Sequence, residues 1–175
     1  MPNTFLDSLH AWQTFYALAG GAAATLIGLM FIAASFIMNR NLRQEEISGA
    51  DTFVTPALVH FICVLLIALI MLIPVITPPV MGMLFILMGV AGTIFAGGVT
   101  LRLFRFQSRE PLTVLDWLTH ALLPQASYLI LLLASIWLLS DAIDALSGMA
   151  AASILLLVSA IRNSWDLAQW LAQHP

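Results

Sequence analysis

The sequence contains no lysine and little charge of either sign. Its 175 residues include six basic side chains, all arginine, and nine acidic ones, so that charged residues make up 9% of the chain. Soluble domains carry about 25% charged residues. This chain therefore lacks the polar surface that a soluble globular protein needs. The net charge of −3 leaves no basic footprint, so we expect no nucleic-acid partner.

Cysteine and the common catalytic motifs are equally scarce. One cysteine, Cys63, cannot form an intramolecular disulfide. The sequence also lacks a phosphate-binding Walker loop, a His-Glu-x-x-His zinc motif, a Gly-x-Ser-x-Gly nucleophile motif and a nucleotide-binding glycine pattern. We therefore predict that the protein is not an enzyme and holds no cofactor.

Apolar residues, by contrast, make up 61% of the chain. A membrane-spanning helix needs roughly 20 consecutive, mostly apolar residues. Five segments meet this requirement: residues 15–38, 54–76, 80–104, 117–139 and 145–165. We predict an all-α membrane protein in which residues 1–175 form a single integral-membrane domain, a bundle of five transmembrane helices.

The arginines predict how this bundle is oriented. All of them fall on one side of a five-helix topology: Arg40, Arg43, Arg102, Arg105, Arg109 and Arg162. The opposite side holds Asp7, Asp141 and Asp144. Because basic residues are retained in the cytoplasm, the N-terminus is predicted outside and the C-terminus in the cytoplasm. We expect a bacterial-type inner membrane, with the lipid bilayer as the first partner.

Small and polar residues form a stripe along one face of the first predicted helix. At helical periodicity the stripe comprises Thr14, Gly21, Thr25, Gly28, Ser35 and Asn39, with Asp7, His10 and Ala17 near its start. Two interpretations are open. Small residues let helices approach closely, which predicts a packing face. Hydroxyls beside a charged mouth also fit the wall of a water-filled pore in a homo-oligomer.

Ionisable residues gather near the predicted cytoplasmic face. Asp116 and His120 are four residues apart and share one side of the fourth predicted helix. His60 opens the second helix at a similar depth, and Arg162 and Asp166 end the fifth. Because such groups are rare in membrane helices, these five residues are candidates for a proton or cation relay. The alternative is structural, since side chains at this depth can reach headgroups and anchor the topology.

A metal site is a third interpretation of the same region. His60, Cys63, Asp116 and His120 are four side chains of the types that bind zinc, although their spacing matches no zinc motif. Two histidines can also hold haem. Deeper in the fourth helix, Gln125 and Tyr128 each need a hydrogen-bond partner within the hydrocarbon, which predicts bonds between helices.

Together these patterns predict a homo-oligomeric channel or small transporter for ions or protons. A second expectation is a non-catalytic scaffolding or regulatory subunit, in which the small residues dock onto a membrane-protein partner. A third is a metal- or haem-binding redox protein of the membrane.

Overall fold

The computed structural model describes residues 5–39, 44–106, 117–140 and 144–173, and every regular element in these ranges is helical. The elements are α1 (Phe5–Asn39), α2 (Gln44–Met71), α3 (Pro78–Phe106), the short π-helical turn η1 (Leu118–Leu122), α5 (Leu123–Leu138) and α6 (Ala145–Gln173). Because η1 continues directly into α5, the chain forms five long rods. All five are long and apolar enough to cross a membrane. The predicted all-α class and the five candidate spans are thus confirmed.

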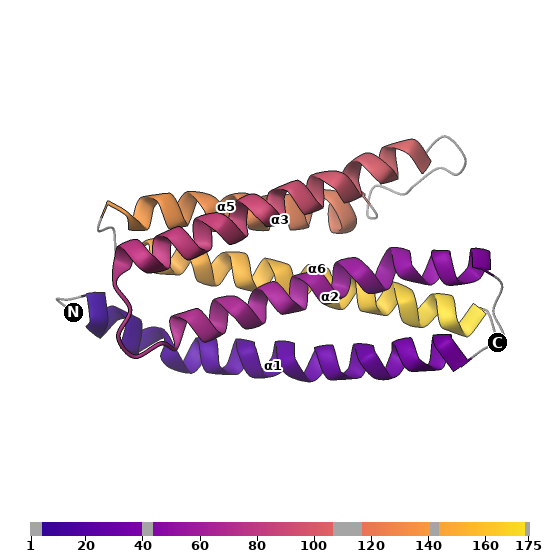
Figure 1. Cartoon of the computed structure of the whole chain (residues 1–175), viewed down its shortest axis with the longest axis horizontal. Helices are drawn as coiled ribbons and strands as arrows, with labels where there is room; N and C mark the ends of the chain where they lie inside the picture. Colours follow the sequence, from indigo (N-terminus) through magenta and orange to yellow (C-terminus); the bar gives the residue numbers. More distant parts are fainter. Residues whose placement is uncertain (1–4, 40–43, 107–116, 141–143, 174–175) are drawn as a thin grey trace.

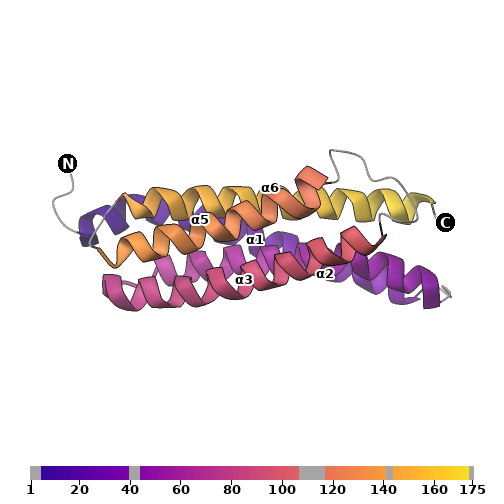
Figure 2. The same cartoon turned by 90° about the horizontal axis from the view of Figure 1, so that it is seen from above.

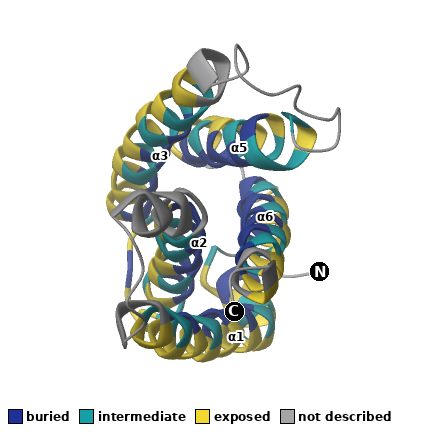
Figure 3. Cartoon of the chain, turned by 90° about the vertical axis from the view of Figure 1, so that its right-hand side faces the viewer, coloured by how far each residue is buried: buried dark blue, intermediate teal, exposed yellow. Residues whose placement is uncertain are grey.

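The five rods lie side by side and alternate in direction (Figures 1 and 2). Viewed along the bundle, α3 pairs with α5, α2 faces α6, and α1 closes the far side (Figure 3). The closest packing joins α1 to α2, α2 to α6, α6 to α5 and α5 to α3, whereas the consecutive helices α2 and α3 hardly touch. Helix α6 therefore links the pair formed by α1 and α2 to the pair formed by α3 and α5.

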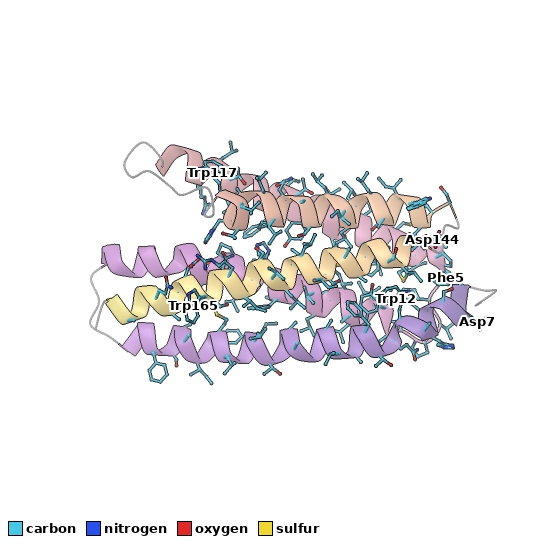
Figure 4. The ribbon with its side chains drawn as sticks, turned by 180° about the vertical axis from the view of Figure 1, so that it is seen from behind. Phe5, Asp7, Trp12, Trp117, Asp144 and Trp165 are labelled. Carbon is cyan, nitrogen blue, oxygen red and sulfur yellow. The ribbon has the colours of Figure 1, made fainter. Side chains whose placement is uncertain are left out.

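The two ends of the bundle differ in charge. Helices α3 and α6 run toward the same end and carry Arg102 and Arg162 in their C-terminal halves, so we call it the arginine end. Asp7 and Asp144 lie at the opposite end, which we call the acidic end (Figure 4). Trp12 lies toward the acidic end, and Trp117 and Trp165 lie toward the arginine end. The acidic end thus carries Asp7 and Asp144, whereas the arginine end carries both basic residues and the carboxylate of Asp166.

The helices extend beyond the apolar segments that predict them. Helix α1 begins at Phe5 rather than near residue 15, and α2 begins at Gln44 rather than near residue 54. Helix α6 continues to Gln173, well past residue 165. Hydropathy locates the part of a helix that suits hydrocarbon. Once a helix has formed, each further residue adds a hydrogen bond at little cost, so polar flanks can join it.

The fourth rod opens with a π-helical turn because of Pro124. The backbone N–H of Leu123 bonds to the carbonyl of Leu118, five residues earlier. Proline lacks an N–H, and its ring collides with the carbonyl four residues before it, which here belongs to His120. Widening the turn relieves this collision, and such π-helical insertions are frequent at functional sites.

Two apolar clusters hold the rods together. The larger contains Tyr16, Met71, Phe85, Leu138 and Met149, and a smaller one toward the arginine end contains Met30, Phe61 and Leu167. Large apolar side chains also cover the outside of the bundle: Leu18, Phe31, Val75, Leu87, Ile94 and Leu133 are each at least 60% exposed. Soluble monomers rarely expose so much contiguous apolar surface. This surface suits the hydrocarbon of a bilayer.

Glycines on α3 set its distance from α5. A Cβ atom at Gly89 would lie 3.0 Å from the Cβ of Leu132, and one at Gly92 would overlap the ring of Tyr128. At Gly97 a Cβ would meet nothing within 4 Å. The contact between α3 and α5 is therefore tight as far as Tyr128 and looser beyond it, toward the arginine end.

Candidate functional site

Three side chains that carry or can carry charge meet inside the arginine end. The Nε2 atom of His120, on η1, lies 3.1 Å from Oδ2 of Asp166 on α6. The other carboxylate oxygen of Asp166 lies 3.4 Å from Nη2 of Arg162, one helical turn earlier. The side chains of His120 and Asp166 are only 15% and 13% exposed, whereas that of Arg162 is 34% exposed. Asp166 thus bridges a histidine and an arginine at the edge of the bundle interior.

Thr119 completes what we call the arginine-end cluster, which consists of Thr119, His120, Arg162 and Asp166. Its hydroxyl lies 3.0 Å from Nδ1 of His120. The ring nitrogen that faces Asp166 is Nε2, which lies at ion-pair distance from the carboxylate. Nδ1 accepts a hydrogen bond from the threonine hydroxyl in the tautomer without a proton on Nδ1, and donates one in the other tautomer. A hydroxyl can take either role, so Thr119 can serve as a partner of Nδ1 in both tautomers of the ring.

Polar atoms near this cluster are incompletely satisfied. Asn163, between Arg162 and Asp166 in sequence, is 1% exposed, and its Oδ1 has no hydrogen-bond partner among the described residues. In the same described set, the Nε atom of Arg162 and the Oε1 atom of Gln125 are also buried without a partner. A buried polar atom left unbonded costs about 1–3 kcal/mol. Such groups are expected to bond to water or to a bound ion or molecule.

A second cluster, the middle cluster, joins α2 to α5 and consists of His60, Cys63 and Tyr128. The hydroxyl of Tyr128 lies 2.9 Å from Nδ1 of His60 and 3.5 Å from Sγ of Cys63. His60 and Tyr128 are almost completely buried. The ring of Phe95, on α3, meets His60 edge to face, with 6.2 Å between ring centroids. The absence of a side chain at Gly92 leaves room for the tyrosine ring.

The structure therefore divides the predicted relay residues between two places. His120, Arg162 and Asp166 come together, and His60 lies in the middle cluster beside Tyr128. The partner that we predicted for His120, Asp116, lies outside the described residues, so that pairing stays a prediction. Asp166 was included among the relay candidates, but its direct contact with His120 was not foreseen. Nothing in the sequence indicated it, because the two residues belong to different helices.

The four candidate metal ligands fall on the same division. The hydroxyl of Tyr128 contacts both His60 and Cys63, whereas His120 contacts Asp166. Asp116 lies outside the described residues. In the described parts of the chain, no group of three or more histidine, cysteine, aspartate or glutamate side chains is arranged to hold a metal ion. The three described members of the proposed ligand set, His60, Cys63 and His120, therefore do not form a metal site by themselves.

The stripe on α1 faces away from the bundle. Thr14, Gly21, Thr25, Gly28 and Ser35 are all exposed. The buried face lies on the opposite side of the helix and contains Leu9, Tyr16, Ala19, Ala23 and Met30. Asn39 ends the helix, and its side chain lies outside the description. The stripe is therefore not a packing face within one copy of the chain, although either predicted use between copies is geometrically open.

Sequence reasoning missed Thr119, whereas Asn163 follows Arg162 directly in the group of polar residues predicted near the cytoplasmic face. Of the two residues predicted to bond between helices, Tyr128 does so, and Oε1 of Gln125 has no partner among the described residues. The hydrogen bond between Tyr128 and His60 confirms that a tyrosine inside an apolar helix bonds to another helix. The sequence contained little indication that His60 would be the partner of Tyr128. Gly92 on α3 leaves room for the tyrosine ring, but this room faces Tyr128 only after the helices have packed.

Comparison of the chain with protein-family models, with curated proteins and with solved structures finds no match in any of the three.

Proposed function

We propose that the protein is a small membrane transporter for protons or small cations, assembled from several copies, with the arginine end in the cytoplasm. The arginine-end cluster is the site that binds and releases the transported charge. The observation that carries the proposal is the contact of the largely buried Asp166 carboxylate with both His120 and Arg162. Ionisable groups at such places are costly to maintain and mark ion and proton pathways.

The chemistry of the cluster supports a proton or a small cation. His120 and Asp166 place an imidazole nitrogen beside a carboxylate oxygen, two groups that proton pathways in membranes commonly use. Asp166 and the oxygen of Asn163 offer the anionic and neutral oxygen atoms that a cation prefers. The thiol and phenol of the middle cluster extend the polar groups farther along α2 and α5.

The rest of the interior favours a transporter over a static pore. Beyond the middle cluster, toward the acidic end, the space between the helices is filled by Met71, Met81, Phe85, Leu138 and Met149. A continuous hydrated path through one copy would require these side chains to move apart. Because polar groups line only the arginine half of the interior, this arrangement supports a mechanism in which the cluster is exposed to one side of the membrane at a time.

The direct test is flux through the purified protein in liposomes. We expect Asp166→Asn, which removes the charge and keeps the shape, to reduce proton or sodium flux by at least about 100-fold. Asp7→Asn, at the acidic end, is the matched control and should retain the wild-type flux. Equal flux in the wild type and Asp166→Asn would refute the proposed transport site.

The orientation can be tested by labelling single cysteines in a Cys63→Ser background. We expect Thr77→Cys to react with a membrane-impermeant reagent from outside the cell, because Thr77 precedes α3 at the acidic end. Gln107→Cys, which follows the arginine-bearing end of α3 in sequence, should react only after the cytoplasmic face is opened. Labelling of both from one side would refute the five-helix topology.

A second candidate function, a docking subunit of a membrane complex, is favoured by the outward face of α1. A Cβ at Gly21 or Gly28 would meet nothing within 4 Å, so this surface is smooth and unfilled. The hydroxyls of Thr25 and Ser35 bond to carbonyls of α1 itself, at Gly21 and Ile32. Satisfied hydroxyls and small residues support a dry contact with another helix, either of a second copy or of a different protein.

Substitutions on α1 separate docking from folding. Gly21→Leu and Gly28→Leu have room within one copy, so we expect unchanged folding and loss of self-association or partner binding. Leu18→Ala, on an exposed part of α1 outside the stripe, should preserve assembly. The measurement is the mass of the detergent-solubilised particle by light scattering. An unchanged mass in both glycine variants would remove the stripe as a subunit contact.

A further inference from the structure

A groove lies between the end of α5 and the start of α6, at the acidic end of the bundle and away from the arginine-end cluster. Its volume is about 420 Å³, within the range of roughly 300–1,000 Å³ of small-molecule sites. The groove is lined by Ile130, Leu133, Ala134, Trp137, Asp144, Ala145, Ser147 and Gly148. It opens on the outer surface, where Leu133 and Trp137 are more than half exposed.

Small residues explain why this space is hollow. A Cβ atom on Gly148 would lie 3.0 Å from the Cβ of Ala134, so the two helix backbones are close at this point. Ala134, Ala145 and Gly148 contribute little or no side-chain volume to the groove. The larger Leu133 and Trp137 also line it, and their exposure places them toward the surface. The groove is thus formed by helices in contact rather than by helices that have separated.

The polar groups of the groove have a distinct chemistry. Asp144 contributes a carboxylate, and Trp137 contributes the aromatic ring that attracts cations most strongly. Arg102 and Arg162, the arginines whose side chains the structure describes, belong to the C-terminal halves of α3 and α6, which point toward the opposite end of the bundle (Figure 1). Apolar walls, one negative charge and one indole ring are complementary to a molecule with an apolar body and a single positive charge.

We propose that this groove binds a hydrophobic organic cation, of the quaternary ammonium or phosphonium class, with its charge beside Asp144 and Trp137. The ligand would enter from the outer half of the bilayer, where amphipathic cations collect. The proposal is independent of transport through the arginine-end cluster, because the two sites share no residue.

One feature of the site opposes cation binding. Asp144 directly precedes α6, and the free N–H groups at a helix N-terminus act as roughly half a positive charge. A carboxylate carries a full negative charge, so its attraction for a cation should exceed this repulsion. Comparison of two ligands of equal shape and opposite charge measures the balance.

The experiment uses the full chain in micelles of an uncharged maltoside detergent. Radiolabelled tetraphenylphosphonium is the cationic probe, and tetraphenylborate, of the same shape, is the anionic one. We expect the wild type to bind the cation saturably, at one site per chain, and at least about tenfold more tightly than the anion. Asp144→Asn should weaken cation binding about tenfold or more, whereas Asp7→Asn, at the same end, should change it by less than about twofold.

Trp137 provides a second, independent readout. Trp137→Leu keeps an apolar wall and should weaken cation binding several-fold, and Trp137→Phe should restore part of the loss because it keeps an aromatic face. Equal binding of the two probes would show that the groove takes only apolar bodies, as it would take a lipid chain. Preference for the anion would show that the helix terminus dominates. Either result, or unchanged cation binding in Asp144→Asn, would overturn the proposal.

Discussion

The two halves of the bundle interior are built differently. Toward the acidic end, buried methionine, phenylalanine and leucine side chains fill the space between the helices. Ser135 and Ser153 are also buried there, but their hydroxyls donate to carbonyls of their own helices. Toward the arginine end, the interior contains the Asp166 carboxylate, the His120 ring and buried polar atoms that lack partners in the described structure.

This contrast separates the part of the molecule that stabilises it from the part that can change state. Close packing makes the acidic half a rigid unit, because any void or extra atom there carries a direct energetic cost. Among the described residues, Ser8 is the exception in this half, since its buried hydroxyl has no hydrogen-bond partner. The arginine half retains unsatisfied groups and a π-helical turn at His120, which natural proteins keep mainly where function requires them. Substitutions in the two halves should therefore differ in what they damage.

The largest expected effect concerns the tight part of the contact between α3 and α5. Gly92→Ala places a methyl group against the ring of Tyr128 and should lower the free energy of unfolding by about 2–3 kcal/mol. Gly97→Ala, on the same helix but in open space, should be neutral or stabilise by up to about 1 kcal/mol, since alanine favours the helix. Unfolding by denaturing detergent measures both. Similar losses at the two positions would contradict the difference between the halves.

A smaller effect is expected from removing single hydroxyl groups. Tyr128→Phe leaves Nδ1 of the buried His60 without its bond to that hydroxyl and should cost about 1–3 kcal/mol of unfolding free energy. Tyr16→Phe, toward the acidic end, removes a longer bond of 3.3 Å to the carbonyl of Leu146. That carbonyl lies within α6 and can keep its helical bond, so we expect a loss of about 0.5–1 kcal/mol. Equal losses of unfolding free energy in the two variants would show that the bond of Tyr128 to His60 stabilises the protein no more than the bond of Tyr16 to Leu146.

The smallest effect is expected at the outer edge of the arginine-end cluster. Arg162→Gln removes a cation that is one-third exposed and separated by 3.4 Å from Asp166. Exposed ion pairs contribute about 0.2–1 kcal/mol, so the unfolding free energy should fall by no more than that. The same denaturing-detergent titration checks this value. A loss above about 2 kcal/mol would mean that the arginine is part of the packed interior and not of its rim.

The sequence by itself determined the class of the protein and the number of its helices. Five apolar segments of sufficient length, with arginines only on one side of the resulting topology, leave little freedom. A segment that spans a membrane must be helical, and consecutive spanning segments must run in opposite directions. The sequence also determined that Tyr128 would need a partner from another helix. These conclusions depend on composition and periodicity, which are properties of one segment at a time.

The tertiary structure decided which groups meet. The order of packing, with α6 between α2 and α5, brings Asp166 to His120 and leaves His60 with Tyr128. The packing of α1 also places its stripe of small and polar residues on the outside of the bundle. The periodicity of that helix is equally compatible with a stripe that faces the interior. Helices in an apolar environment gain no hydrophobic energy from choosing one neighbour over another. Their arrangement follows from close contacts such as Gly92 against Tyr128 and Gly148 against Ala134, which exist only once several helices have come together.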